Sequence, residues 1–168
     1  MSILQSVHYC DVRTFAWCLR RKHRETAVRF SRLISHSADG PLYLLGGIAL
    51  FFAGQAALAK VLALGFIVER ICYTILKSYF RRNRPAAVIT GYQSEIQPSD
   101  TFSFPSGHTS AAFFMSGCLS IAFPWVAWFI YPWACGAGVA RVTLGVHFPT
   151  DILAGACLGT AVCLLVTG

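Results

Sequence analysis

Three short segments of this chain carry side chains of the kinds that bind and transfer phosphoryl groups. They are residues 77–85, 105–108 and 141–151, and each lies at the edge of a long apolar stretch. Helices that face lipid or a protein core rarely carry charge in such places. The three segments are therefore the first candidates for a functional site.

The cations and the glycine of these segments predict an anion-binding cradle. Lys77, Arg84 and Arg141 supply three positive charges. An arginine fork matches the oxygens of a phosphate, and a lysine adds a point charge. Ser106 and Gly107 begin an expected helix, whose first backbone N–H groups are free to bind an anion. Such a cradle stabilises the charge that builds up while a phosphoryl group is transferred.

Two histidines divide the expected chemistry. Asp151 follows His147 by four residues and can hold one nitrogen of its ring. The other nitrogen is then the nucleophile that forms a phosphohistidine. We assign to His108 the protonation of the leaving oxygen and the later activation of water. The carboxylates are too few for a two-metal phosphatase, so we expect no metal and no other cofactor.

Each segment has an alternative explanation when it is taken alone. His108 fits a helix cap, Arg141 and Asp151 fit a structural ion pair, and the arginines within 81–84 fit membrane-interface anchors. The expected topology favours a shared site, because two membrane spans separate the first segment from the third. All three segments then meet at one end of a helical bundle.

The composition predicts a single membrane domain over residues 1–168. Hydrophobic residues make up 55% of the chain and charged residues 12%, and the mean hydropathy is +0.57. Soluble domains carry about 25% charged residues. The net charge of +7 comes almost entirely from residues before Pro85, with Arg141 as the one later cation. This distribution fits membrane-surface charge plus one anion site and argues against nucleic-acid binding.

The apolar pattern predicts an all-α membrane bundle of about five transmembrane helices and an N-terminal amphipathic helix. The basic segment 1–40 contains that helix at 11–36, which fits the plane of the membrane interface or else packs on the bundle. Asp39 is a candidate N-cap for the next helix. Residues 81–104 form a long polar loop. The spans of the catalytic bundle, residues 41–168, are expected at about 41–57, 61–80, 107–123, 125–143 and 150–167.

The expected spans contain one pair of charged residues and one pair of closely spaced glycines. Glu69 and Arg70 are charges within the second span, for which an ion pair, mutual or between helices, is the simpler reading and a functional role the alternative. Gly155 and Gly159 form a small-xxx-small pair that lets two helices approach closely.

At these motifs the sequence resembles the type-2 phosphatidic acid phosphatase superfamily. The family pattern is K-x6-R-P, then P-S-G-H, then S-R-x5-H-x3-D, and the three segments fit it except that Ala140 replaces the last serine. That change removes one possible hydrogen bond to phosphate and should tune the site without abolishing it. The resemblance covers residues 41–168 and implies a helical bundle that acts without metal. It places the nucleophile at His147, the acid at His108 and the orienting carboxylate at Asp151.

The resemblance implies hydrolysis of a phosphate ester or diphosphate of a membrane lipid, such as phosphatidic acid, phosphatidylglycerol phosphate, or a polyprenyl phosphate or diphosphate. One alternative is a non-catalytic membrane protein that binds lipid head groups, and another is an enzyme like the related, soluble vanadate-dependent haloperoxidases. We expect a multi-pass protein of a bacterial inner (cytoplasmic) membrane. The basic N-terminal helix should face the cytoplasm, and two spans return the catalytic end to that side. The sequence leaves the identity of the lipid and the oligomeric state open.

Overall fold

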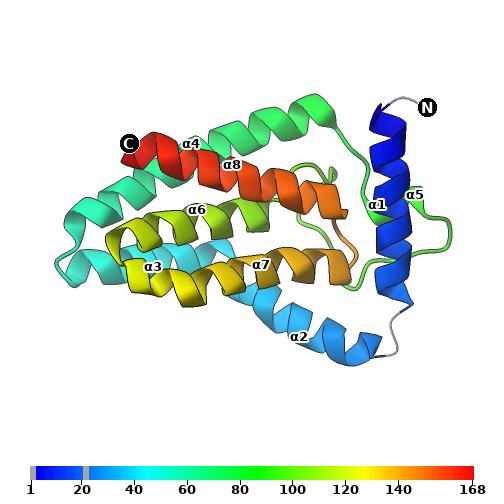
Figure 1. Cartoon of the computed structure of the whole chain (residues 1–168), viewed down its shortest axis with the longest axis horizontal. Coiled ribbons are helices and arrows are strands. Elements are labelled where there is room, and N and C mark those ends of the chain that lie inside the picture. The colour runs from blue at the N-terminus through cyan, green and yellow to red at the C-terminus, as the bar shows by residue number, and fades with distance from the viewer. Residues whose placement is uncertain (1–2, 21–22) are drawn as a thin grey trace.

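The computed structural model describes residues 3–20 and 23–168, which fold into helices joined by short connections and one long loop (Figure 1). Within these ranges the strand-like pairing is a single bridge between Asn83 and Phe102. The elements are α1 (Ile3–Leu19), α2 (Arg24–Ser37), α3 (Gly40–Phe52), α4 (Ala56–Phe80), α5 (Pro85–Val88), α6 (Gly107–Ala122), the short 3₁₀ helix η1 (Pro124–Val126), α7 (Ala127–Thr143) and α8 (Pro149–Thr167).

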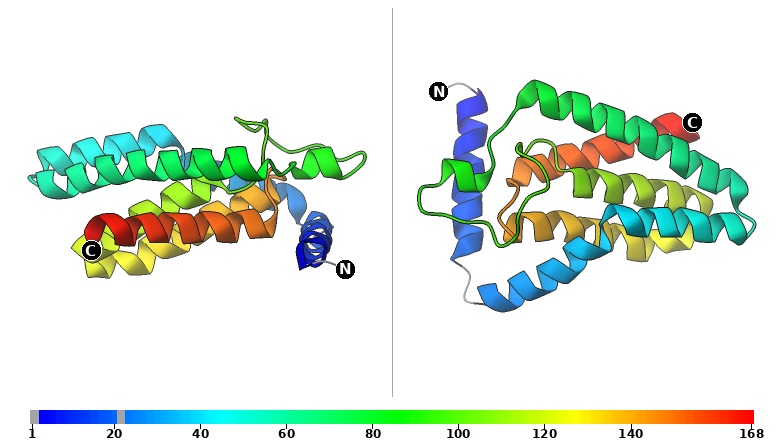
Figure 2. Two further views of the ribbon diagram at one scale, coloured as in Figure 1. Left: turned by 90° about the horizontal axis from the view of Figure 1, so that it is seen from above. Right: turned by 180° about the vertical axis from the view of Figure 1, so that it is seen from behind.

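Five long helices form the bundle, with α6 at its centre. Figure 2 shows α3 and α4 together on one side of α6, and α7 and α8 on the other. A Cβ atom on Gly155 would lie 2.5 Å from the carbonyl oxygen of Ser106, and one on Gly159 would lie 2.1 Å from that of Ser110. Both positions therefore require glycine for α8 to approach the α6 backbone, as the small-xxx-small pair predicts.

The expected helix boundaries within 41–167 agree with the structure to within a few residues, apart from the ends of the first two. The chain turns between α3 and α4 at Gly54, whose φ of +81° lies in the region that favours glycine. α3 therefore ends at Phe52 rather than 57, and α4 begins at Ala56 rather than 61. The predicted loop 81–104 is irregular except for the four-residue α5.

The N-terminal segment differs from the prediction. A single helix at 11–36 was expected, whereas the structure has two, α1 and α2, with the break between Leu19 and Arg24. α1 lies across the end of the bundle at which α8 begins (Figure 1), and α2 packs along α7. Phe15 explains the position of α1, because its fully buried ring packs edge-on against Phe148 and Tyr92. Of the two predicted locations for the N-terminal helix, the membrane interface or the surface of the bundle, packing on the bundle describes both α1 and α2.

One described helix, α8, is long and apolar enough to cross a membrane by itself, and α3 is apolar but has only 13 residues. A helix rises about 1.5 Å per residue, so α3 spans about 20 Å of a hydrocarbon core of about 30 Å. α4 has 25 residues but carries Lys60, Glu69, Arg70 and Lys77. The all-helical fold is confirmed for the described residues, and five membrane spans remain a prediction.

Candidate active site

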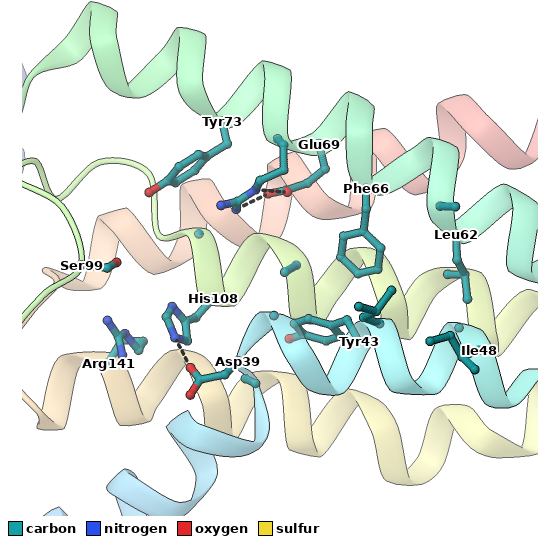
Figure 3. Close-up of a pocket in the computed structure, with 18 of the residues that line it drawn as sticks. Asp39, Tyr43, Ile48, Leu62, Phe66, Glu69, Tyr73, Ser99, His108 and Arg141 are labelled. Carbon is teal, nitrogen blue, oxygen red and sulfur yellow. Dashed lines mark hydrogen bonds and ion pairs between the residues drawn. The ribbon is translucent and has the colours of Figure 1, made fainter.

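A cavity of about 770 Å³ lies between α3, α4 and α6 and has two chemically distinct ends. Figure 3 shows Asp39, Ser99, His108 and Arg141 at one end, and Ile48, Leu62 and Phe66 toward the other. Of the predicted site residues, Arg84, Gly107, His108, Arg141 and His147 line the cavity. The remaining three, Lys77, Ser106 and Asp151, are buried and do not line the cavity. The three sequence segments thus meet at one end of the bundle.

His147 is buried between the first turn of α8 and the cavity. Its Nδ1 lies 3.8 Å from Oδ2 of Asp151, which is within ion-pair range but too long for a hydrogen bond. Nδ1 is buried and has no hydrogen-bond partner among the described residues. Burial lowers the pKa of His147 to about 4, opposed by Asp151 and reinforced by the charges of Arg84 and Arg141. The imidazole is therefore neutral at pH 7, the form that a nucleophile requires.

The Asp151 carboxylate is held by groups other than histidine. Its Oδ2 accepts a hydrogen bond of 2.8 Å from the backbone N–H of Phe148, which is the N-cap of α8. Its Oδ1 accepts one of 2.8 Å from Nη1 of Arg82. Arg82 also donates through Nη2 to Asp11 of α1 at 2.6 Å. A fixed chain of charges thus runs from α1 through Arg82 to the carboxylate beside His147.

His108 also has a carboxylate partner, which is Asp39. Nε2 of His108 lies 2.8 Å from Oδ1 of Asp39, and Nδ1 of His36 lies 2.6 Å from the other oxygen. Asp39 occupies the N-cap position of α3, as predicted, but its side chain makes no capping hydrogen bond. Burial would raise the pKa of Asp39, yet the hydrogen bonds from the two histidines leave it below its usual value. The ionised carboxylate therefore accepts a hydrogen bond from Nε2–H of His108.

Lys77 and Arg84 converge on Asp100, a residue of the long loop. Lys77 donates through Nζ to Oδ2 of Asp100 at 2.7 Å, and Arg84 donates through Nη2 to Oδ1 at 2.5 Å. Tyr73 donates its hydroxyl to the same carboxylate at 2.7 Å. Burial would raise the pKa of Asp100, but these hydrogen bonds hold it at about 2. An acidic side chain thus gathers the two cations at the edge of the cavity.

The remaining cradle residues come from α6 and α7. Arg141 donates through Nη1 to Oγ of Ser35 at 2.8 Å, whereas its buried Nε has no partner among the described residues. Arg141 and Asp151 do not pair with each other, so the alternative of a structural ion pair between them is not what the structure has. Ser106 caps α6, because its hydroxyl accepts hydrogen bonds from the N–H of Thr109 at 3.5 Å and from its hydroxyl at 2.9 Å. A spare donor on Arg141 and free N–H groups at the start of α6 suit an anion.

Three acidic or basic neighbours of the site were missed as site residues in the sequence. The sequence indicates a helix cap at Asp39, a membrane-interface anchor at Arg82 and a loop around Asp100. Each reaches its partner across many residues of chain, so local spacing gives no sign of the contact. The available signal was the small number of acidic residues, which is seven in the whole chain. A carboxylate in so apolar a chain needs a charged or hydrogen-bonding partner, so each one is a candidate contact of the site cations.

Comparisons with known proteins agree with the motifs. The family model described as PAP2 superfamily matches residues 56–168. Phosphatidylglycerophosphatase B of Bacillus subtilis is 30% identical over 146 residues, which cover 76% of this chain. The chain spans 66% of the length of that relative. Among solved structures, Aquifex aeolicus LpxE superposes with a TM-score of 0.82 at 25% identity, covering 94% of each chain. A transmembrane PAP2-type phosphatidylglycerolphosphate phosphatase from Bacillus subtilis gives 0.79 at 26% identity, covering 97% of this chain and 85% of its own.

Proposed function

This chain belongs to the PAP2 superfamily, and we propose that it is a membrane enzyme that hydrolyses a lipid phosphate through a phosphohistidine. The observation that carries the proposal is one cavity with two histidines and two arginines at its polar end and apolar side chains at the other. A lipid phosphate has the same division between a charged group and a hydrocarbon chain. A small polar molecule would make no favourable contacts with the apolar half of the cavity.

The geometry supports a division of roles among the residues. Arg84, Arg141 and the N-terminus of α6 hold the phosphoryl oxygens, and Lys77 adds charge from behind them. His147 attacks phosphorus through Nε2, the ring nitrogen opposite Nδ1, while the bond from phosphorus to the lipid oxygen breaks. His108 gives that oxygen a proton and then takes one from the water that hydrolyses the phosphohistidine. The products are the dephosphorylated lipid and inorganic phosphate.

A membrane location follows from the outside of the bundle. Large apolar side chains are exposed on the helices that surround the cavity, and Trp128 of α7 retains 83% of its exposure. Others are Leu64, Ile75, Phe129 and Leu165. Exposed large apolar side chains on several helices favour a membrane or an interaction surface. We propose that α3, α4, α6, α7 and α8 span the bilayer, and that the apolar half of the cavity, between α3 and α4, receives the lipid chain.

Phosphate release tests the proposal. Detergent-purified protein should release phosphate from phosphatidic acid or a polyprenyl phosphate in the presence of EDTA, and vanadate should inhibit it. His147→Ala should lower the rate about 10³-fold or more, because it removes the nucleophile. The matched control is His23→Ala, an exposed histidine at the start of α2, which should leave the rate unchanged. Release that persists in His147→Ala, or none from any lipid phosphate with the wild type, contradicts the proposal.

A further inference from the structure

Glu69 and Arg70 form an ion pair at the junction between the two ends of the cavity. Nε of Arg70 lies 3.0 Å from Oε2 of Glu69, and Nη2 lies 3.4 Å from Oε1, so one edge of the guanidinium faces the carboxylate. Both residues line the cavity, and dashed lines in Figure 3 mark their contact. The pair satisfies the simpler sequence interpretation. Because the pair lies beside the proposed phosphate site, the alternative interpretation, a functional role for Glu69 and Arg70, also applies.

Arg70 lies against the start of α6. A Cβ atom on Gly107 would lie 3.1 Å from Nη2 of Arg70 and 2.9 Å from the ring of Tyr73. The guanidinium carbon is also 4.2 Å from the centroid of that ring. Gly107 is the first residue of α6, and the free backbone N–H groups at the start of a helix can bind an anion. Arg70 is therefore a neighbour of the phosphate cradle, one step nearer to the apolar half of the cavity.

The groups at this junction have hydrogen-bond donors left over. A guanidinium has five N–H donors, and Glu69 engages only one edge of it. The hydroxyl of Tyr43 is buried and has no hydrogen-bond partner among the described residues. In Figure 3 this hydroxyl points toward the polar end of the cavity. A ligand that fills the junction must therefore accept hydrogen bonds, which an alkyl chain cannot do.

We infer that Arg70, held in place by Glu69, and Tyr43 bind the lipid-attached phosphate of a lipid diphosphate. The inference rests on the proposed function. His147 forms its bond to the terminal phosphorus, and the bond from that phosphorus to the bridging oxygen breaks. The electron pair leaves on the lipid monophosphate, whose added negative charge Arg70 stabilises. Water then cleaves the phosphohistidine and releases inorganic phosphate.

The Glu69 carboxylate explains how such an arginine is stable before substrate binds. Glu69 is fully buried, and the side chain of Arg70 keeps 53% of its exposure. An unpaired charge inside a bundle is costly, and a paired one costs much less. The carboxylate also fixes the orientation of the fork, so that its second edge is presented to the ligand.

The test compares two substrates that differ only in the number of phosphates, farnesyl phosphate and farnesyl diphosphate. Arg70→Gln should lower kcat/KM, from initial rates, about 10- to 100-fold for the diphosphate and less than about threefold for the monophosphate, because it removes charge-assisted hydrogen bonds to the lipid-attached phosphate. Arg70→Lys should restore part of the loss. The matched control is Arg81→Gln, an exposed arginine at the end of the same helix, which should change neither value.

The outcomes separate this inference from the proposed function. An equal loss on both substrates with Arg70→Gln overturns the diphosphate subsite and leaves the phosphatase intact. No phosphate release from either substrate by the wild type overturns the proposed function. If Arg70→Gln does not fold, Tyr43→Phe removes a single oxygen and should lower kcat/KM about threefold or more for the diphosphate alone. A Tyr43→Phe protein with unchanged selectivity also overturns the subsite.

Discussion

Each of the two histidines of the site lies near a carboxylate. The carboxylate near His147 is four residues away in the sequence, and the one near His108 is 69 residues away. Asp151 lies 3.8 Å from His147, and Asp39 lies 2.8 Å from His108. A carboxylate that accepts a hydrogen bond from one ring nitrogen fixes the tautomer and orientation of the imidazole and stabilises its protonated form. Asp39 is thus a positioning residue for the proposed general acid.

Asp39→Asn should slow the release of a poor leaving group much more than that of a good one. A lipid alkoxide needs the proton of His108, whereas p-nitrophenolate leaves without it. We expect kcat/KM to fall about 10- to 100-fold for a lipid phosphate and less than about threefold for p-nitrophenyl phosphate, because general acid catalysis contributes about 10²–10⁴-fold. Rates of both substrates with the same purified variant give the comparison.

The control for this prediction changes the other partner of the same carboxylate. His36 binds the second oxygen of Asp39, and its side chain is 84% exposed. His36→Gln should leave both substrates within about twofold of the wild type. A similar loss on both substrates with Asp39→Asn would mean that Asp39 supports the fold and not the acid.

The residues of the proposed site were predicted from the sequence to the extent that short motifs contain them. His108, His147 and the cradle cations lie in three dense segments, and five of the eight predicted residues line one cavity. Asp39 and Asp100 carry no motif, because their partners are 69 and 23 residues away. Only the folded chain brings such pairs together.

At the scale of elements, the helices of the bundle were predictable and the N-terminal arrangement was not. Long apolar stretches bounded by Pro, Gly and charged residues mark α3, α4, α6, α7 and α8. In the segment 11–36, Phe15, Leu19, Phe30 and Leu33 recur near one face of a continuous helix, so the pattern predicts one helix and not two. Tertiary contacts decide it, since Phe15 and Asp11 pack on the start of α8 and fix α1 across the bundle.

α1 should support the site through Asp11. Asp11 is 2% exposed and accepts hydrogen bonds from Arg82 at 2.6 Å, from the N–H of Thr150 at 3.1 Å and from the Thr150 hydroxyl. Asp11→Asn removes the charge that holds Arg82 and should destabilise the protein by about 3 kcal/mol, as breaking a buried ion pair does. The free energy of unfolding in detergent measures this loss.

The same substitution should also affect turnover, because Arg82 connects Asp11 to Asp151. We expect kcat to fall about tenfold at a temperature where the variant is still folded. Arg13→Gln, on the exposed face of α1, is the matched control and should change neither quantity. Normal stability and kcat in Asp11→Asn would show that α1 is independent of the site.

At the scale of the whole molecule, apolar side chains cover the bundle and charge gathers at one end. The cradle, α1 and the arginines of α2 (Arg24, Arg29 and Arg32) all belong to that end or to the helices that pack against it. Loops rich in Lys and Arg remain on the cytoplasmic side of a bacterial membrane. The cradle cations do not count in this argument, because the chemistry requires them on either side.

Cys10 reports which side of the membrane carries the site. It is exposed on α1, the helix that lies across the end of the bundle with the proposed site. With a cytoplasmic site, a membrane-impermeant maleimide should label Cys10 in inverted membrane vesicles and not in intact spheroplasts. Cys10→Ser identifies the signal, since Cys18 and Cys72 are only partly exposed and Cys135 and Cys157 lie in the proposed spans. Labelling of Cys10 from outside the spheroplasts would place the cradle on the outer face, where it would act on lipids of the outer leaflet.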